Sequence, residues 1–105
     1  MENIKSILQE LNKVVHEKTR LGILILLYKR GELNFKYLKH MLGVSDGSLA
    51  THLKTLAREG YIIIRKKFVR GKPRTEYKLT NEGKLQLEKY IEKLEELIKV
   101  FKTAV

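Results

Sequence analysis

Six cations and no acid occupy the ten residues from Arg65 to Arg74, which read RKKFVRGKPR. Stretches typical of β-strands lie on both sides of the centre of this segment, which predicts a basic hairpin. Cations at a turn suit phosphate, because they offset its charge and donate hydrogen bonds to it. The candidate phosphate-binding residues are Arg65, Lys67, Arg70, Lys72 and Arg74. A solvated charged turn is the alternative for an isolated run of this kind.

Short polar side chains precede the hairpin, on a predicted amphipathic helix from Ser45 to Arg58. Leucines at helical spacing form its core face, and hydroxyl, imidazole and guanidinium groups lie on or near the other side. Such groups suit base edges and nearby phosphates at close range. The candidate contact residues are Ser45, Ser48, Thr51, His52, Thr55 and Arg58. The alternatives are an ordinary polar helix surface and, for His52, a hydrogen bond within the protein.

Helical periodicity predicts three helices before this one, at residues 2–15, 16–30 and 35–42. The second is apolar nearly all round, which is typical of a helix buried on several sides. Gly31 and Gly43 are expected to end helices, Asn34 to cap the third, and Ser45 or Asp46 to cap the fourth. The turn before the fourth helix has only about three residues, which is helix-turn-helix spacing.

After the fourth helix, two strands at 61–68 and 74–79 are expected to join through Gly71, Lys72 and Pro73. Tyr61 and Tyr77 on these strands, and Tyr28 on the second helix, follow a buried pattern and are predicted core residues. Thr80 is a good N-cap for a long last helix. The order helix, helix, turn, helix, basic hairpin is the winged helix-turn-helix arrangement, an α+β fold that is mainly α.

Composition limits the classes of function. The formal net charge of the 105 residues is +10, and residues 80–105 contribute none of it, since five lysines there offset five glutamates. A polyanionic partner is therefore favoured, with salt-sensitive binding. The absence of cysteine excludes disulfides and thiolate metal sites. No signal peptide and no membrane span are evident, which predicts a cytoplasmic protein that makes no membrane contact.

Residues 42–83, LGVSDGSLATHLKTLAREGYIIIRKKFVRGKPRTEYKLTNEG, resemble winged-helix transcriptional regulators of bacteria and archaea related to the MarR and ArsR groups. The motifs are a GxSDGxLxxHLKxLxxxGY block and a KPRTxYxLTxxG block, within a resemblance that runs from about Arg20 to Tyr90. It implies a homodimeric DNA-binding regulator that dimerises through its terminal helices. The chain lacks the Asp-x-Arg pair common in MarR wings and the cysteines of metal-sensing ArsR proteins, so neither a MarR-style drug response nor a thiolate metal switch is expected.

The two terminal helices carry apolar positions beyond what a wing domain of this size needs to cover, which favours a dimer. The candidate interface residues are Ile4, Leu8, Leu11, Leu87, Ile91, Leu94, Ile98 and Phe101. We expect one domain, residues 1–105, with a winged-helix core at 16–80 and dimerisation helices at 2–15 and 80–102. A twofold dimer would place its two recognition helices about 34 Å apart, so a pseudo-palindromic operator is expected.

The sequence therefore predicts a sequence-specific regulator that binds double-stranded DNA as a homodimer. The alternatives are a winged-helix module that binds protein and a nonspecific, chromatin-type DNA binder. An enzyme is disfavoured, because no nucleophile with its base, no phosphate-cradling glycine loop and no paired carboxylates are evident. No cofactor or metal is expected. A small effector could occupy apolar space beside the dimer helices, but no set of residues requires one.

Overall fold

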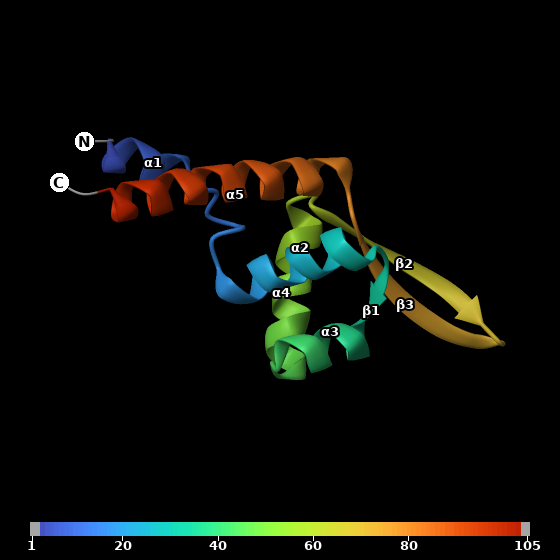
Figure 1. Cartoon of the computed structure of the whole chain (residues 1–105). Helices are drawn as coiled ribbons and strands as arrows, with labels where there is room; N and C mark the ends of the chain where they lie inside the picture. The colour runs from blue at the N-terminus through green and yellow to red at the C-terminus, as the bar shows by residue number, and fades with distance from the viewer. Residues whose placement is uncertain (1–2, 104–105) are drawn as a thin grey trace.

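The computed structural model describes residues 3–103 (Figure 1). Five helices and three strands follow one another in the order of a winged helix-turn-helix. They are α1 (Ile4–Glu10), α2 (Lys18–Arg30), β1 (Leu33–Asn34), α3 (Phe35–Leu42), α4 (Asp46–Arg58), β2 (Ile62–Val69), β3 (Lys72–Leu79) and α5 (Asn81–Lys102). The predicted fold class, mainly α with a small antiparallel sheet, is confirmed.

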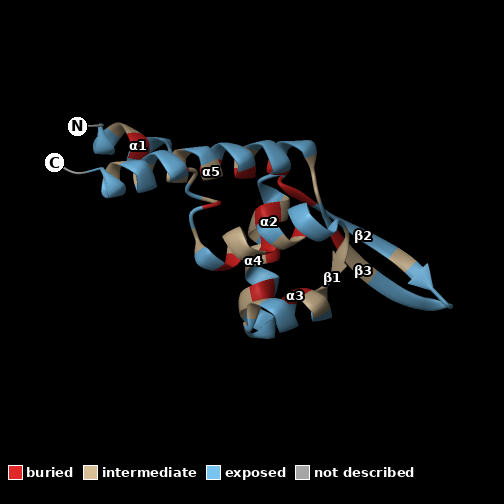
Figure 2. Cartoon of the chain, in the orientation of Figure 1, coloured by how far each residue is buried: buried red, intermediate tan, exposed pale blue. Residues whose placement is uncertain are grey.

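One apolar core holds α2, α3, α4 and the base of the sheet against the first half of α5 (Figure 2). Its fully buried members come from each of these elements except α5 and from the segment before α2, and α5 adds two residues that are almost fully buried. They are Val15, Ile23, Leu24, Leu38, Leu49, Leu56 and Ile62, with Leu87 and Tyr90 from α5. The leucine spacing on α4 therefore places that helix against α2 and leaves its opposite side free.

Capping residues define both ends of α3 and the start of α4. The Asn34 side chain accepts a hydrogen bond from the backbone N–H of Tyr37, and Gly43 ends α3 in the left-handed region with φ 64°. Ser45 then caps α4 by accepting from the N–H of Ser48. These predicted caps are confirmed, and they set the short turn between the two helices.

The sheet has the order β1-β3-β2, and all its pairs are antiparallel. Val69 pairs with Lys72 at the end of the hairpin, so the turn consists of Arg70 and Gly71 alone, with φ 54° and 76°. The prediction that Lys72 and Pro73 lie in the turn was wrong, because both belong to β3. A two-residue turn with both φ positive matches the twist of the strands, and it lengthens the paired wing.

The first helix is shorter than its apolar spacing predicts. It ends at Glu10, and the side-chain oxygen of Asn12 accepts hydrogen bonds from the backbone N–H groups of Val14 and Val15. Such a side chain offers the backbone an alternative to helix. Residues 11–17 therefore form an irregular linker, and α2 begins at Lys18 in place of residue 16.

Helix α5 extends well past the core, and α1 lies beside its distal part (Figure 1). An ion pair of 2.6 Å joins the ammonium of Lys93 to the carboxylate of Glu10. The carboxylates of Glu10 and Glu96 hydrogen-bond this ammonium and raise the pKa of Lys93. Within residues 3–103, no helix has both the length and the apolar character that crossing a bilayer requires.

Two of the three predicted core tyrosines are buried, and the third is not. Tyr61 and Tyr77 are 9% and 8% exposed, whereas Tyr28 is 42% exposed. The Tyr28 hydroxyl donates a 2.7 Å hydrogen bond to the carboxylate of Glu88, which raises the pKa of Tyr28, and the ammonium of Lys84 lies 5.6 Å from the ring centre. This side of α2 faces an open groove beside α5, which explains the error.

Candidate DNA-binding surface

The free side of α4 is centred on different residues from those that the sequence pattern favoured. At about 100° per residue, the positions opposite the core leucines are Gly47, Thr51, Lys54 and Arg58. All four are exposed, as are Ser45 and Ala50. Gly47, Ala50 and Lys54 were missed, although counting the helix angle from Leu49, Leu53 and Leu56 would have found them.

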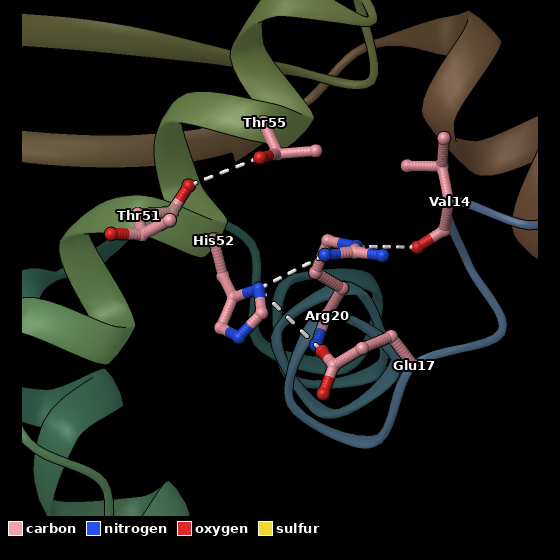
Figure 3. A network of polar contacts seen from close by, with 6 residues as sticks. All are labelled: Val14, Glu17, Arg20, Thr51, His52 and Thr55. Carbon is pink, nitrogen blue, oxygen red and sulfur yellow. Dashed lines mark hydrogen bonds and ion pairs between the residues drawn. The ribbon is translucent and has the colours of Figure 1, made fainter.

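The other candidates on α4 are only half exposed. Ser48, His52 and Thr55 lie at the edges of the free side. The Thr55 hydroxyl donates to the carbonyl of Thr51 in the preceding turn, at 3.2 Å (Figure 3). The Ser45 hydroxyl already accepts a hydrogen bond as the cap of α4 and keeps its own O–H to donate.

His52 lies in a polar network with the start of α2 (Figure 3). Its Nδ1 is 3.1 Å from Nη1 of Arg20 and 3.6 Å from Oε1 of Glu17. Burial raises the pKa of Glu17, but hydrogen bonds from the backbone N–H groups of Arg20 and Thr19, with the charge of Arg20, outweigh burial and lower it overall. The internal hydrogen bond, one of the two alternatives for His52, is therefore present at Nδ1.

Three of the five predicted wing cations are paired with acids. Lys67 Nζ lies 2.8 Å from a carboxylate oxygen of Glu76, and Arg74 Nε lies 3.9 Å from the other. The hydrogen bond lowers the pKa of Glu76 and raises that of Lys67. Arg65 and Lys67 also contact Glu32, at 3.6 and 3.2 Å. The buried Glu32 oxygen there has no hydrogen bond among the described residues, so we treat these two contacts as ion pairs.

Three other cations of the hairpin have no such partner. Lys66, Arg70 and Lys72 are exposed, and none of them forms an ion pair within residues 3–103. Phe68, which pairs with Pro73 across the hairpin, is 78% exposed. At the end of the wing, Arg70 and Lys72 therefore carry charge that no acid of the described residues pairs with, whereas Arg65, Lys67 and Arg74 are paired. The role of Glu32 was missed, because the tertiary fold alone brings β1 beside the hairpin.

Residues 19–98 match the model of a protein family described as a winged helix DNA-binding domain. The chain belongs to this winged-helix family. It is 36% identical over 87 residues to an uncharacterised protein of Methanocaldococcus jannaschii, a match that covers 83% of this chain and 95% of that protein. The predicted resemblance to winged-helix regulators is thereby confirmed at the level of the family.

Solved structures with the same fold support this assignment to the winged-helix family. A transcriptional regulator homologue from Pyrococcus horikoshii OT3 is 26% identical, with a TM-score of 0.84, and the match covers 98% of this chain and 100% of that one. A protein of Enterococcus faecalis V583 assigned to the MarR family of transcriptional regulators is 22% identical, with a TM-score of 0.73 and coverage of 96% and 90%. At that identity, it shows the shared fold alone. The family is thus described as DNA-binding, and the Pyrococcus horikoshii structure is that of a transcriptional regulator homologue.

In this winged-helix chain, the predicted dimer residues divide by burial. Leu11 and Leu87 are 8% and 4% exposed. Both lie in the monomer's own core, which leaves little of either side chain for a partner. Ile91 and Leu94 are half buried against that core. The other four predicted interface residues are exposed on α1 and α5, and they are Ile4, Leu8, Ile98 and Phe101.

A largely apolar groove separates α2 from α5 on the outside of the winged-helix core. It encloses ≈ 370 Å³ and is lined by Ile25, Tyr28, Leu87, Glu88 and Ile91. The groove is open to solvent and includes the Tyr28–Glu88 hydrogen bond. This groove is apolar space beside the last helix.

Proposed function

We propose that the chain is a transcriptional regulator that binds double-stranded DNA sequence-specifically as a homodimer. The observation that carries the proposal is the end of the wing, where Arg70 and Lys72 project with no acid partner among residues 3–103. Family membership and the free side of α4 support it. A net charge of +10 suits a protein to binding phosphate.

In this proposal, α4 enters the major groove and the wing follows the backbone or the adjacent minor groove. Thr51 and Arg58 have the exposure that contact requires, and Lys54 joins them as a phosphate contact. Ser45, Ser48 and Thr55 lie beside them and reach DNA from the edges of α4. Arg70 and Lys72 contribute affinity and set the register on the DNA, while sequence specificity comes mainly from α4.

The dimer forms through the exposed apolar residues of α1 and the distal part of α5. Ile4, Leu8, Ile98 and Phe101 are all at least 39% exposed, and covering them removes apolar surface from water. Twofold symmetry then sets the two α4 helices about one DNA turn apart, so the operator is a pseudo-palindrome.

Salt-dependent binding to duplex DNA tests the proposal. Affinity should fall steeply as salt rises, and Arg70→Ala and Lys72→Ala should each reduce the slope of log affinity against log salt by about one. Lys67→Ala is the matched control, because its ammonium is already paired with Glu76 and Glu32, so its slope should change least. Undetectable or salt-insensitive binding would contradict the proposal.

A protein-binding module is the second candidate, and the exposed Phe68 on the wing favours it. Large apolar side chains left in water are typical of protein contacts. Phe68→Ala separates the two, since a regulator should keep its DNA affinity within a few fold, whereas a protein-binding wing would lose its partner. A nonspecific DNA binder would show similar affinity for all duplexes, but a regulator should prefer its operator by about 10³ or more.

A further inference from the structure

The linker of residues 11–17 is tied both to α5 and to the segment that follows α4. The side-chain N–H groups of Asn12 donate to the hydroxyl of Tyr61, at 2.9 Å, and to the side-chain oxygen of Gln86, at 3.1 Å. Tyr61 lies between the end of α4 and β2. The path of the linker is therefore set by contacts with elements that are distant in sequence.

Arg20 extends these ties to the middle of α4. Its Nε donates a 2.6 Å hydrogen bond to the backbone carbonyl of Val14 in the linker, and its Nη1 approaches Nδ1 of His52 (Figure 3). The two contacts use two donors of one planar guanidinium, so they hold its orientation. Arg20 is half buried and lies at the start of α2.

The charge state of Arg20 decides which nitrogen of His52 carries hydrogen. A guanidinium is always protonated and can only donate, so at 3.1 Å the Nδ1 atom of His52 must accept. The opposite arrangement, with hydrogen on Nδ1 and donated to Glu17, would span 3.6 Å, which is too long for a good hydrogen bond. The distances therefore favour Nδ1 of His52 as the acceptor, with the ring hydrogen on Nε2.

We propose that Arg20 is a positioning residue for sequence reading, which fixes His52 so that its Nε2–H points out of the protein as a donor. Figure 3 shows Nε2 on the side of the ring away from Arg20. This inference rests on the proposed DNA binding. A donor in that direction selects acceptor atoms, such as the purine N7, the guanine O6 or a phosphate oxygen. Arg20 itself contacts no DNA.

Measurements on the imidazole nitrogens of His52 in the free protein test whether Arg20 fixes the position of the ring hydrogen. Their ¹⁵N chemical shifts identify the protonated nitrogen, and His52→Gln assigns the signals. We expect hydrogen on Nε2 in the wild type. In Arg20→Gln, a population with hydrogen on Nδ1 should appear, because Glu17 then becomes the nearest charged partner of the ring. Hydrogen on Nδ1 in the wild type, or no change in the variant, would overturn the proposal.

DNA binding tests the second half, with an operator selected by the wild type from random duplexes. Arg20→Gln should reduce the preference for the operator over a scrambled duplex about tenfold, the value of one hydrogen bond, and leave the salt slope unchanged. Arg58→Gln is the matched control, since loss of a phosphate contact should lower the slope by about one and spare the preference. A lower slope in Arg20→Gln, or an unchanged preference, would refute the positioning role.

A second variant distinguishes the loss of the outward donor from a folding defect. His52→Asn keeps an acceptor near Nδ1 for Arg20 and removes the outward N–H, so it should show the same tenfold loss with an unchanged melting temperature. An unchanged preference in this variant would also refute the proposal. If the wild type prefers no sequence at all, the proposed function fails, while the imidazole measurement still decides the relation between Arg20 and His52.

Discussion

Gly83 in the first turn of α5 packs directly on the backbone of Tyr61. A β-carbon at Gly83 would lie 2.0 Å from the Tyr61 carbonyl oxygen and 2.8 Å from its carbonyl carbon. Two hydrogen bonds hold the same joint, from the N–H of Thr80 to that oxygen and from the Thr80 hydroxyl to the carbonyl of Gly60. The start of the last helix is thus fixed to the segment that leaves α4.

Gly83→Ala should therefore destabilise the fold, because backbone atoms cannot rotate away as a flexible side chain does. We expect a loss of about 1 to 3 kcal/mol, the usual cost of overpacking, measured by urea unfolding. Gly47→Ala is the matched control. Open space surrounds Gly47 on α4, so alanine there should stabilise by about 0.5 to 1 kcal/mol. Equal effects of the two changes would contradict the close packing of Gly83.

At Arg70 in the wing turn, the backbone conformation is unfavourable for arginine, whereas the positive charge favours DNA binding. Its φ of 54° is unfavourable for arginine and favourable for asparagine. Arg70→Asn should raise stability by about 1 kcal/mol and reduce the salt slope of DNA binding by about one. Lys72→Asn removes the same charge in β3, and it should weaken DNA binding without raising the melting temperature. A stability gain in both variants would show that charge repulsion, and not backbone strain, is responsible.

The lowered pKa of Glu17 predicts an acid-dependent loss of stability. Because the pKa is lower in the folded chain than its ordinary value of 4.5, the contribution of Glu17 is present above about pH 4.5 and is lost as pH falls through the folded pKa. Glu17→Gln should be less stable than the wild type at neutral pH, and the gap should narrow on acidification. Urea unfolding across this range measures it. A gap that is independent of pH would contradict the ionised role of Glu17.

Phe101 offers a test of the dimer, since it is 88% exposed on the distal part of α5. Phe101→Glu should weaken self-association by about 2 kcal/mol or more, because a charge would be buried in an apolar contact. Phe68→Glu is the matched control, as Phe68 is 78% exposed on the wing, which lies at the opposite end of the molecule from α1 and the distal part of α5 (Figure 1). Sedimentation equilibrium measures both. Equal weakening by the two changes, or by neither, would place the interface elsewhere.

Local patterns were sufficient for the element types, the caps and the family. Leucines at helical spacing, Asn34, Gly43 and Ser45 at helix ends, and alternation in the hairpin act through neighbours a few residues away. Their outcome therefore depends little on the rest of the chain. The basic wing and the polar side of α4 were predictable for the same reason.

Contacts between distant segments decided what the local patterns could not. Asn12 joined the linker to Tyr61 and Gln86, while Glu32 reached the wing because β1 pairs with β3. Arg20 and His52 are separated by 32 positions and meet because α2 packs on α4. Charge and hydrogen-bond partners depend on which side chains the fold brings within about 3 Å, and periodicity carries no information about that distance. The sequence by itself thus determined a basic winged helix, and the tertiary structure determined which of its cations and which nitrogen of His52 remain free.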